Sequence, residues 1–228
     1  MLWNRKYKYP TSRREIIDGK RHYEINNEKL PSCTEILNAT MPIEKKEKLN
    51  QWVEKVGKKE SQIIAQRAAH RGTKLHKYLE DYLNNKLNLN LFEDNSREFL
   101  MAQQIIENGL KNKLNEIWGI EENLYFPNKF GGAADLIAGD YEGNSAILDF
   151  KSSSKARQDS WNEDYYLQVS GYISAHNEVY GTSIDKGVIL ICTEDNFFQR
   201  FIIEGDRLQK YKQMFFERVD QYYSQIKK

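Results

Sequence analysis

The sequence of 228 residues is long enough to bury one full-sized hydrophobic core. Hydrophobic residues make up 39% of it and charged residues 29%, which excludes an intrinsically disordered chain. A net charge of +1 is low for a protein that binds a long duplex through its phosphates, and it favours local basic surfaces or a short contact near a strand end.

The cysteines and the apolar runs indicate the compartment. Cys33 and Cys192 are far apart in the sequence and too few for an iron–sulfur cluster, so neither that cluster nor a disulfide framework is expected. The first residues lack a signal-peptide pattern, and the longest apolar run, 188–192, is too short to cross a membrane. We therefore expect a cytoplasmic protein without a membrane partner, in the host cytoplasm if it comes from a phage.

The chain opens with short elements. The alternation over residues 22–25, followed by Asn26 and Asn27, predicts a strand and a turn. Ser32 and Glu35 have the spacing of a capping box, which predicts a short helix that begins there and ends near residues 41–42.

A basic helical segment follows. Residues 44–77 have a helical pattern with Gly57 and Gly72 as candidate breaks, and Thr73 is the predicted cap of a helix that runs to about Asn84. The segment carries ten lysines and arginines against four glutamates. Such an excess can follow a phosphate backbone, and a solvated helix face with i,i+4 ion pairs explains it equally well.

The remaining elements alternate between the two periods. We predict a helix over 96–115, strands over 120–126, 133–138 and 145–151 with a turn at 140–144, a helix over 164–179, strands over 186–192 and 197–203, and an amphipathic helix over 206–226. This order indicates one α/β domain with a helical N-terminal portion. We expect a single domain over 1–228, in which residues 1–70 form an N-terminal hairpin and basic helical portion and 71–228 the catalytic core.

Two apolar strands contain acidic residues. Asp135 follows the small residues 131–134, and a carboxylate there is costly unless it is paired, solvated or bound to a metal. Asp149 and Lys151 point to one face of their strand because side chains alternate. An acid that holds a hard cation beside an ammonium group suits phosphodiester hydrolysis, whereas a simple ion pair at a strand end is the alternative.

Two helices add further candidates. His76 and Glu80 are spaced i,i+4 and share a helix face, although a lone histidine is more often structural than a ligand. Tyr165, Gln168 and Tyr172 also share one face, and taken by themselves they are better explained by core packing of that helix.

Taken together, these elements resemble the RecB-type branch of the PD-(D/E)XK nuclease superfamily. That branch combines G-x-x-x-H, G-x-x-D, D-x-K and Q-x-x-x-Y, which stand here in order at Gly72–His76, Gly132–Asp135, Asp149–Lys151 and Gln168–Tyr172. Residues 30–37 also resemble the opening of the mitochondrial genome maintenance exonucleases and related phage exonucleases. The resemblance implies a restriction-endonuclease-like core, with a central mixed sheet flanked by helices.

The resemblance also implies a role for each residue. The catalytic set would be Lys151, Asp149, Asp135 and His76, and one or two Mg²⁺ or Mn²⁺ ions would be held by His76, Asp135, Asp149 and the main-chain carbonyl of Phe150. Residues that contact or position DNA would be Gln168, Tyr172, Ser152, Ser153, Thr73 and Arg71, with Glu80 supporting His76 or Lys151.

The function that the resemblance implies is hydrolysis of DNA by a metal-dependent exonuclease that prefers single-stranded ends, with replication or recombination proteins as partners. Two alternatives share the fold. One is a duplex-resecting exonuclease of the phage recombination type, and the other is a nucleic-acid-binding protein that has lost its activity.

Overall fold

The computed structural model describes residues 1–17, 19–86 and 95–226. A six-stranded sheet runs through it in the order β1-β5-β6-β7-β8-β9. Its strands are β1 (Leu2–Trp3), β5 (Leu114–Phe126), β6 (Phe130–Tyr141), β7 (Asn144–Ser153), β8 (Lys186–Thr193) and β9 (Phe198–Glu204). The sheet is mixed, because β1 pairs with β5 and β7 pairs with β8 in parallel while the other neighbours are antiparallel.

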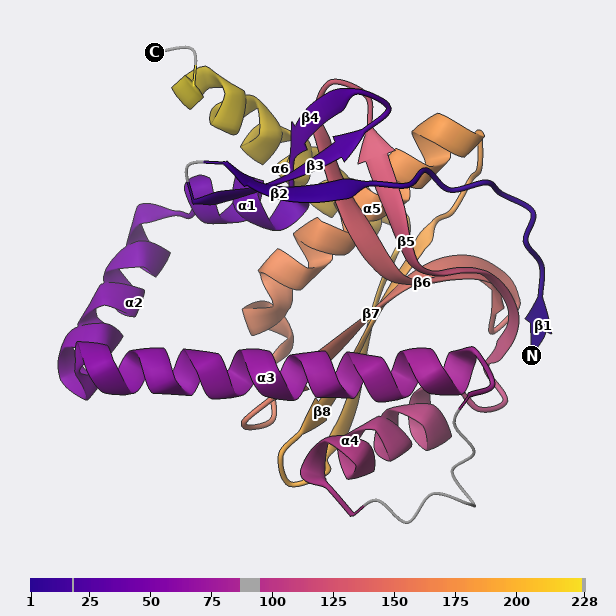
Figure 1. Cartoon of the computed structure of the whole chain (residues 1–228), viewed down its shortest axis with the longest axis horizontal. Coiled ribbons are helices and arrows are strands. Elements are labelled where there is room, and N and C mark those ends of the chain that lie inside the picture. The colour runs from indigo at the N-terminus through magenta and orange to yellow at the C-terminus, as the bar shows by residue number, and fades with distance from the viewer. Residues whose placement is uncertain (18, 87–94, 227–228) are drawn as a thin grey trace.

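A smaller antiparallel sheet lies against β6, above the long helix in Figure 1. It consists of β2 (Arg13–Ile17), β3 (Lys20–Ile25) and β4 (Glu28–Pro31). The predicted turn joins β3 and β4, and both Asn26 and Asn27 have the positive φ that a two-residue hairpin turn requires. Sequence reasoning found β3 but missed its two short neighbours, whose alternation covers only four or five residues.

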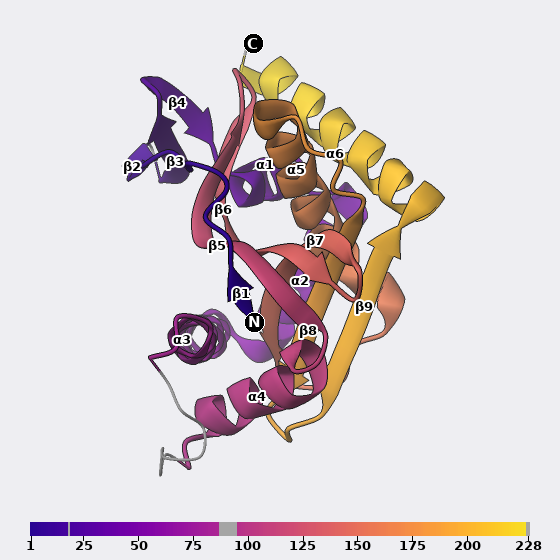
Figure 2. The ribbon, with the colours of Figure 1, turned by 90° about the vertical axis from the view of Figure 1, so that its right-hand side faces the viewer.

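Helices cover both faces of the large sheet, as the side view in Figure 2 shows. On one face lie α3 (Lys58–Leu83) and α4 (Arg97–Ile105), and on the other lie α5 (Glu163–Tyr180) and α6 (Gly205–Ile226). The helix α1 (Cys33–Ala39) packs with α5 and α6, whereas α2 (Ile43–Val56) buries no residue. The α/β fold with a central mixed sheet flanked by helices and a helical N-terminal portion is confirmed. Among the helices described, none is long and apolar enough to cross a membrane.

The long helix α3 differs from its prediction. Only Gly57, with φ of 92°, breaks the basic segment, and α3 continues through Gly72 and Thr73 without interruption. Thr73 is not a cap, since its Oγ1 donates to the carbonyl of Ala69 in the preceding turn. A glycine inside a helix costs only about 1 kcal/mol relative to alanine, which is too little to end a helix that is otherwise well supported.

The helix predicted over 96–115 is also shorter than expected. It begins after the cap Ser96 and ends as α4 at Ile105, and a π-helical turn, Ile106–Leu110, leads to β5. The turn brings Gly109 so close to the sheet that a Cβ there would lie 2.9 Å from Cδ1 of Leu190. Counting this turn, the helical stretch ends at Leu110, before the predicted end at residue 115.

The alternation of β7 decides which side each charged residue faces. Leu148 and Phe150 belong to the core under α3 and α4, whereas Ile147 belongs to the core under α5 and α6. Asp149 and Lys151 continue the row of Ile147, so their side chains lie on the α5 side of the sheet.

Candidate metal centre

The central strand β7 carries a largely buried ion pair near its end. Nζ of Lys151 lies 2.6 Å from Oδ2 of Asp149, and Asp149 is only 1% exposed. Burial raises the pKa of Asp149, and the neighbouring ammonium opposes that effect. Burial lowers the pKa of Lys151, but Asp149 and Asp135 outweigh it and raise that pKa. The lysine therefore stands as an ammonium group, and it lies on the same face as Asp149, as the alternation predicted.

Asp135 reaches the same place from β6. The last paired residues of β6 and β7 at this end are Leu136 and Leu148. Asp135 and Asp149 come next, one on each strand. Oδ2 of Asp135 accepts the main-chain N–H of Phe150 at 2.7 Å. The carboxylate thus takes the place of a ladder hydrogen bond at the point where the two strands separate, and it is 8% exposed.

The helix α3 brings His76 onto the same strand end. Nε2 of His76 lies 2.8 Å from the carbonyl oxygen of Phe150, and Nδ1 lies 3.6 Å from Oδ1 of Asp135. Because a carbonyl only accepts, Nε2 carries a proton in this arrangement. Burial lowers the pKa of His76, but Asp135 and Glu121 outweigh it and raise the pKa to about 9.

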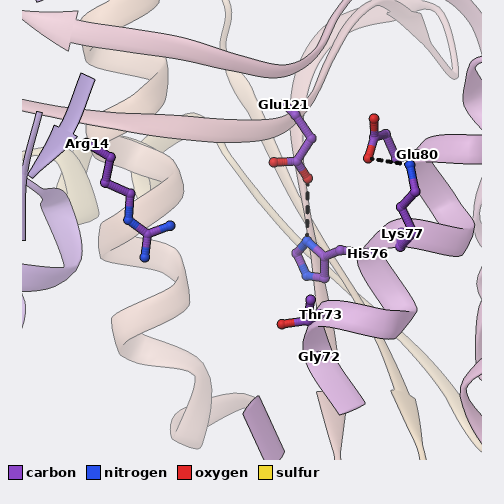
Figure 3. Close-up of a pocket in the computed structure, with 7 residues that line it drawn as sticks. All are labelled: Arg14, Gly72, Thr73, His76, Lys77, Glu80 and Glu121. Atoms are coloured by element: carbon purple, nitrogen blue, oxygen red, sulfur yellow. Dashed lines mark ion pairs between the residues drawn. The ribbon is translucent and has the colours of Figure 1, made fainter. Parts of the chain in front are cut away.

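Glu121 of β5 is a member of this cluster that sequence reasoning missed. Its Oε1 lies 3.6 Å from Nδ1 of His76, the contact drawn in Figure 3. The pairs Ile120–Leu136 and Glu122–Ala134 flank it, so it lies opposite Asp135 in the sheet. One donor atom each from His76, Glu121 and Asp135 lies within 4.8 Å of the others, a separation that one ion can bridge.

The donor set fits a hard divalent cation. Oδ1 of Asp149 is buried and accepts no hydrogen bond from any residue in the described ranges. A buried carboxylate oxygen without a partner is costly, and a cation removes that cost. The surrounding donors are mainly oxygens, from Asp135, Glu121 and the carbonyl of Phe150, together with one imidazole, and hard divalent cations prefer oxygen ligands.

An open cavity of about 610 Å³ adjoins the imidazole. As Figure 3 shows, α3 forms one wall, and Arg14 from β2 and Glu121 from β5 stand across from it; the lining residues are Arg14, Gly72, Thr73, His76, Lys77, Glu80 and Glu121. We expected Glu80 to support His76 or Lys151, but its carboxylate pairs with Lys77 at 3.5 Å. The difference arises because Lys77 shares the helix with Glu80 at i,i+3, whereas the imidazole turns toward the sheet.

The helix α5 supports the other side of the ion pair. Nε2 of Gln168 donates to the hydroxyl of Tyr172 at 3.0 Å, so these two predicted residues do meet. The ring of Tyr172 packs on β6, where a Cβ at Gly132 would lie 2.6 Å from Cε1 of that ring. The ring of Tyr165 lies under the ammonium of Lys151, with 5.2 Å between Nζ and the ring centroid.

The remaining predicted contacts are more scattered. Ser152 lies where α3 crosses β7, since a Cβ at Gly72 would be 3.9 Å from its Oγ. The hydroxyl of Ser153 donates to the carbonyl of Lys155 at 2.7 Å and is thereby engaged in its own loop. Arg71 does not line the cavity beside His76; it contacts Glu194 on another face of α3.

Comparison with known proteins adds a distant relative. No protein-family model matches the sequence. The chain is 28% identical over 183 residues to mitochondrial genome maintenance exonuclease 1 of Mus musculus, which covers 75% of this chain and 52% of that protein. The chain thus spans about half the length of this curated relative. Among solved structures, it is similar to a presumed exonuclease from Eubacterium rectale, with a TM-score of 0.45 and 14% identity over 67% of this chain and 66% of that one.

Proposed function

We propose that the protein is a metal-dependent DNA nuclease of the RecB-type branch of the PD-(D/E)XK superfamily, acting as an exonuclease on single-stranded ends. One observation carries the proposal: two contacting pairs, His76 with Asp135 and Asp149 with Lys151, meet at the end of β7, where the main chain of Phe150 bonds to both members of the first pair. The exonuclease that is 28% identical to the chain supports the same class of reaction. The large and small sheets both line the cavity beside His76, which supports one nuclease domain over residues 1–228.

His76, Asp135, Asp149 and the Phe150 carbonyl would hold Mg²⁺ or Mn²⁺, and Glu121 adds a further carboxylate to this set. When bound, such an ion supplies Lewis-acid stabilisation of the phosphate and a more acidic water. Asp135 has Glu121 and His76 on one side and the strand end of Asp149 on the other. That central position suits Asp135 as a ligand shared by two ions if two bind.

Lys151 would act on the attacking water and on the charge that develops at phosphorus. Its ammonium group donates hydrogen bonds, so it can orient the water and offset negative charge in the transition state. The Tyr165 ring and the carboxylate of Asp149 hold the ammonium from two sides. The Gln168–Tyr172 pair packs on Gly132 and so fixes the position of α5 against β6 beside the ammonium group.

The cavity beside His76 would receive the strand. Arg14 and Lys77 line it and carry donors of the kind that contact phosphate oxygens. A preference for single strands is supported by the low net charge, because a long duplex footprint needs more basic residues. The basic residues of α2 and α3 would then follow a single strand into the cavity.

The test compares three end-labelled DNA substrates with Mg²⁺: a linear single strand, a linear duplex and a circular single strand. The proposal expects rapid digestion of the linear single strand, slower digestion of the duplex and an intact circle. Faster digestion of the duplex would replace the proposal by a duplex-resecting exonuclease, and equal cutting of circles would make the enzyme an endonuclease. If no substrate is digested, the protein is a nucleic-acid-binding protein without nuclease activity.

A further inference from the structure

A second hollow, of about 430 Å³, lies on a different face of α3 from the cavity beside His76. Its residues on α3 recur at a helical spacing, and α4, the chain after β7 and the β8–β9 turn close the other sides. The lining residues are Ile64, Arg67, Ala68, His70, Arg71, Arg97, Glu98, Ser154 and Glu194. Three arginines thus face two carboxylates in a concave site that the catalytic proposal does not use.

Two of these arginines converge on one carboxylate. Nη1 of Arg71 contacts Oε1 of Glu194, and Nη1 of Arg97 lies 2.5 Å from Oε2. Arg71 is mostly buried, and its Nε makes no hydrogen bond within the part of the chain that the structure describes. Arg67 lines the same hollow and makes no ion pair with a described residue. Guanidinium groups arranged in this way form an oxyanion-binding site, here called the seat, with N–H donors that Glu194 does not use.

The hollow is connected to the catalytic strand. The main-chain N–H of Glu194 donates to the carbonyl of Ser153 at 3.1 Å, so the β8–β9 turn is tied to the end of β7. Ser154 lines the hollow three residues after Lys151, which is about 10 Å along extended chain. A DNA strand whose cleaved phosphate lies beside Lys151 would therefore have neighbouring phosphates within reach of these arginines.

We infer that this hollow binds a backbone phosphate of the substrate strand a few nucleotides from the cleaved bond, and that Glu194 occupies the seat until the strand arrives. The inference rests on the proposed function, because the ligand is the same nucleic acid. A phosphate fits better than a second carboxylate, since it offers more acceptor oxygens to the free donors of Arg67 and Arg71.

The test is binding of a fluorescent single strand of about 20 nucleotides, which is long enough to pass both sites, in chelator so that no cleavage occurs. Arg67→Gln and Arg97→Gln change exposed side chains, and Glu194→Gln removes the competing charge while keeping the shape. Arg200→Gln is the matched control, because Arg200 pairs with the carboxylate of Glu142 and does not line the hollow. Melting temperatures check that every variant is folded.

We expect each of the two arginine variants to weaken binding severalfold and to reduce the slope of log affinity against log salt by about 0.7, the value for one single-strand phosphate. Glu194→Gln should bind more tightly, and Arg200→Gln should match the wild type. Wild-type affinity and slope in folded Arg67→Gln and Arg97→Gln would overturn the inference. That outcome leaves the proposed function intact. If instead the arginine variants bind more weakly but the wild-type protein cleaves no substrate, only the nuclease proposal is contradicted.

Discussion

Nε2 of His76 lies 2.8 Å from the carbonyl oxygen of Phe150, a residue 74 positions further along the chain. The N–H of the same Phe150 is held by Asp135 at 2.7 Å. The main chain of one residue at the end of β7 therefore locates both the imidazole of α3 and the carboxylate of β6. Since these contacts use main-chain atoms, the sheet itself sets the geometry of the site.

Replacing the central lysine should separate catalysis from binding. Lys151→Ala is expected to lower the cleavage rate by roughly 10²–10⁴-fold, the usual contribution of a group that acts on a proton in the transition state. Binding of single strands in chelator should be nearly unchanged. Asp149 loses its partner in this variant, so melting temperatures should be measured to check that the variant is folded. Lys151→Arg, which keeps the positive charge, should be assayed beside it. Lys111→Ala, at an exposed ion pair, is the control, and cleavage at the wild-type rate by Lys151→Ala would contradict the assigned role.

The two glutamates beside the cavity should behave differently toward metal. Glu121→Gln is expected to weaken binding of Mn²⁺ by about 10-fold or more, because Glu121 faces His76 and Asp135. Glu80→Gln is the matched control, since Glu80 lines the same cavity but pairs with Lys77. Calorimetric titration of the DNA-free protein measures both affinities. Equal losses in the two variants, or a loss only in Glu80→Gln, would restore the assignment that the sequence favoured.

The two motif glycines should respond in opposite directions to alanine. Gly132→Ala places a Cβ 2.6 Å from Cε1 of Tyr172, an overlap expected to lower the free energy of unfolding by about 1–3 kcal/mol. Gly72→Ala meets only Ser152 Oγ at 3.9 Å inside α3, so it should raise that free energy by about 0.5–1 kcal/mol. Urea denaturation measures both values. A Gly132→Ala variant as stable as the wild type would show that Tyr172 does not pack on β6 so closely.

The buried His176 should make stability depend on pH. Tyr9 donates its hydroxyl to Nε2 at 3.1 Å, while Thr182 donates to Asn177 and so accepts from Nδ1 of His176 at 2.8 Å. Both ring nitrogens are engaged in the neutral form, and burial lowers the pKa of His176 from 6.5 to about 4.

The unfolded chain therefore binds this proton more readily than the folded protein. The stabilisation is fully present above pH 6.5 and is lost as the pH falls toward 4, by roughly 3 kcal/mol in total. The measurement is the free energy of unfolding across this range in the wild type and His176→Gln, with His22→Gln as a surface control. The His176 variant should lose that part of the slope. An identical slope in both proteins would mean that the imidazole is not held neutral.

Sequence reasoning found the parts of the site that depend on local periodicity. The alternation of a strand was enough to put Asp149 and Lys151 on one face, and Ser32 does accept from the N–H of Glu35 as its spacing predicted. The ordered motifs also identified His76 and Asp135, which the fold brings within 3.6 Å. These relationships were readable because each depends on spacing within one element or on the order of motifs.

The features that sequence reasoning missed depend on pairing between elements. Glu121 lies opposite Asp135 only through the register of β5 with β6, and its left-handed backbone, at φ of 53°, has no signature in the residue type. Arg14 reaches the cavity from the small sheet, more than fifty residues before Gly72. Arg71 was expected to contact DNA, and the helix phase of α3 puts it in a different hollow from His76, which spacing along the chain did not reveal.

Binding of a divalent metal ion at the end of β7 is tested most directly by locating Mn²⁺ in crystals of the protein from its anomalous scattering. We expect a peak enclosed by His76, Asp135, Asp149 and the carbonyl of Phe150, and we expect Asp135→Asn to abolish it. Manganese bound only elsewhere, or no peak at saturating Mn²⁺ in well-ordered crystals, would contradict the metal-dependent mechanism.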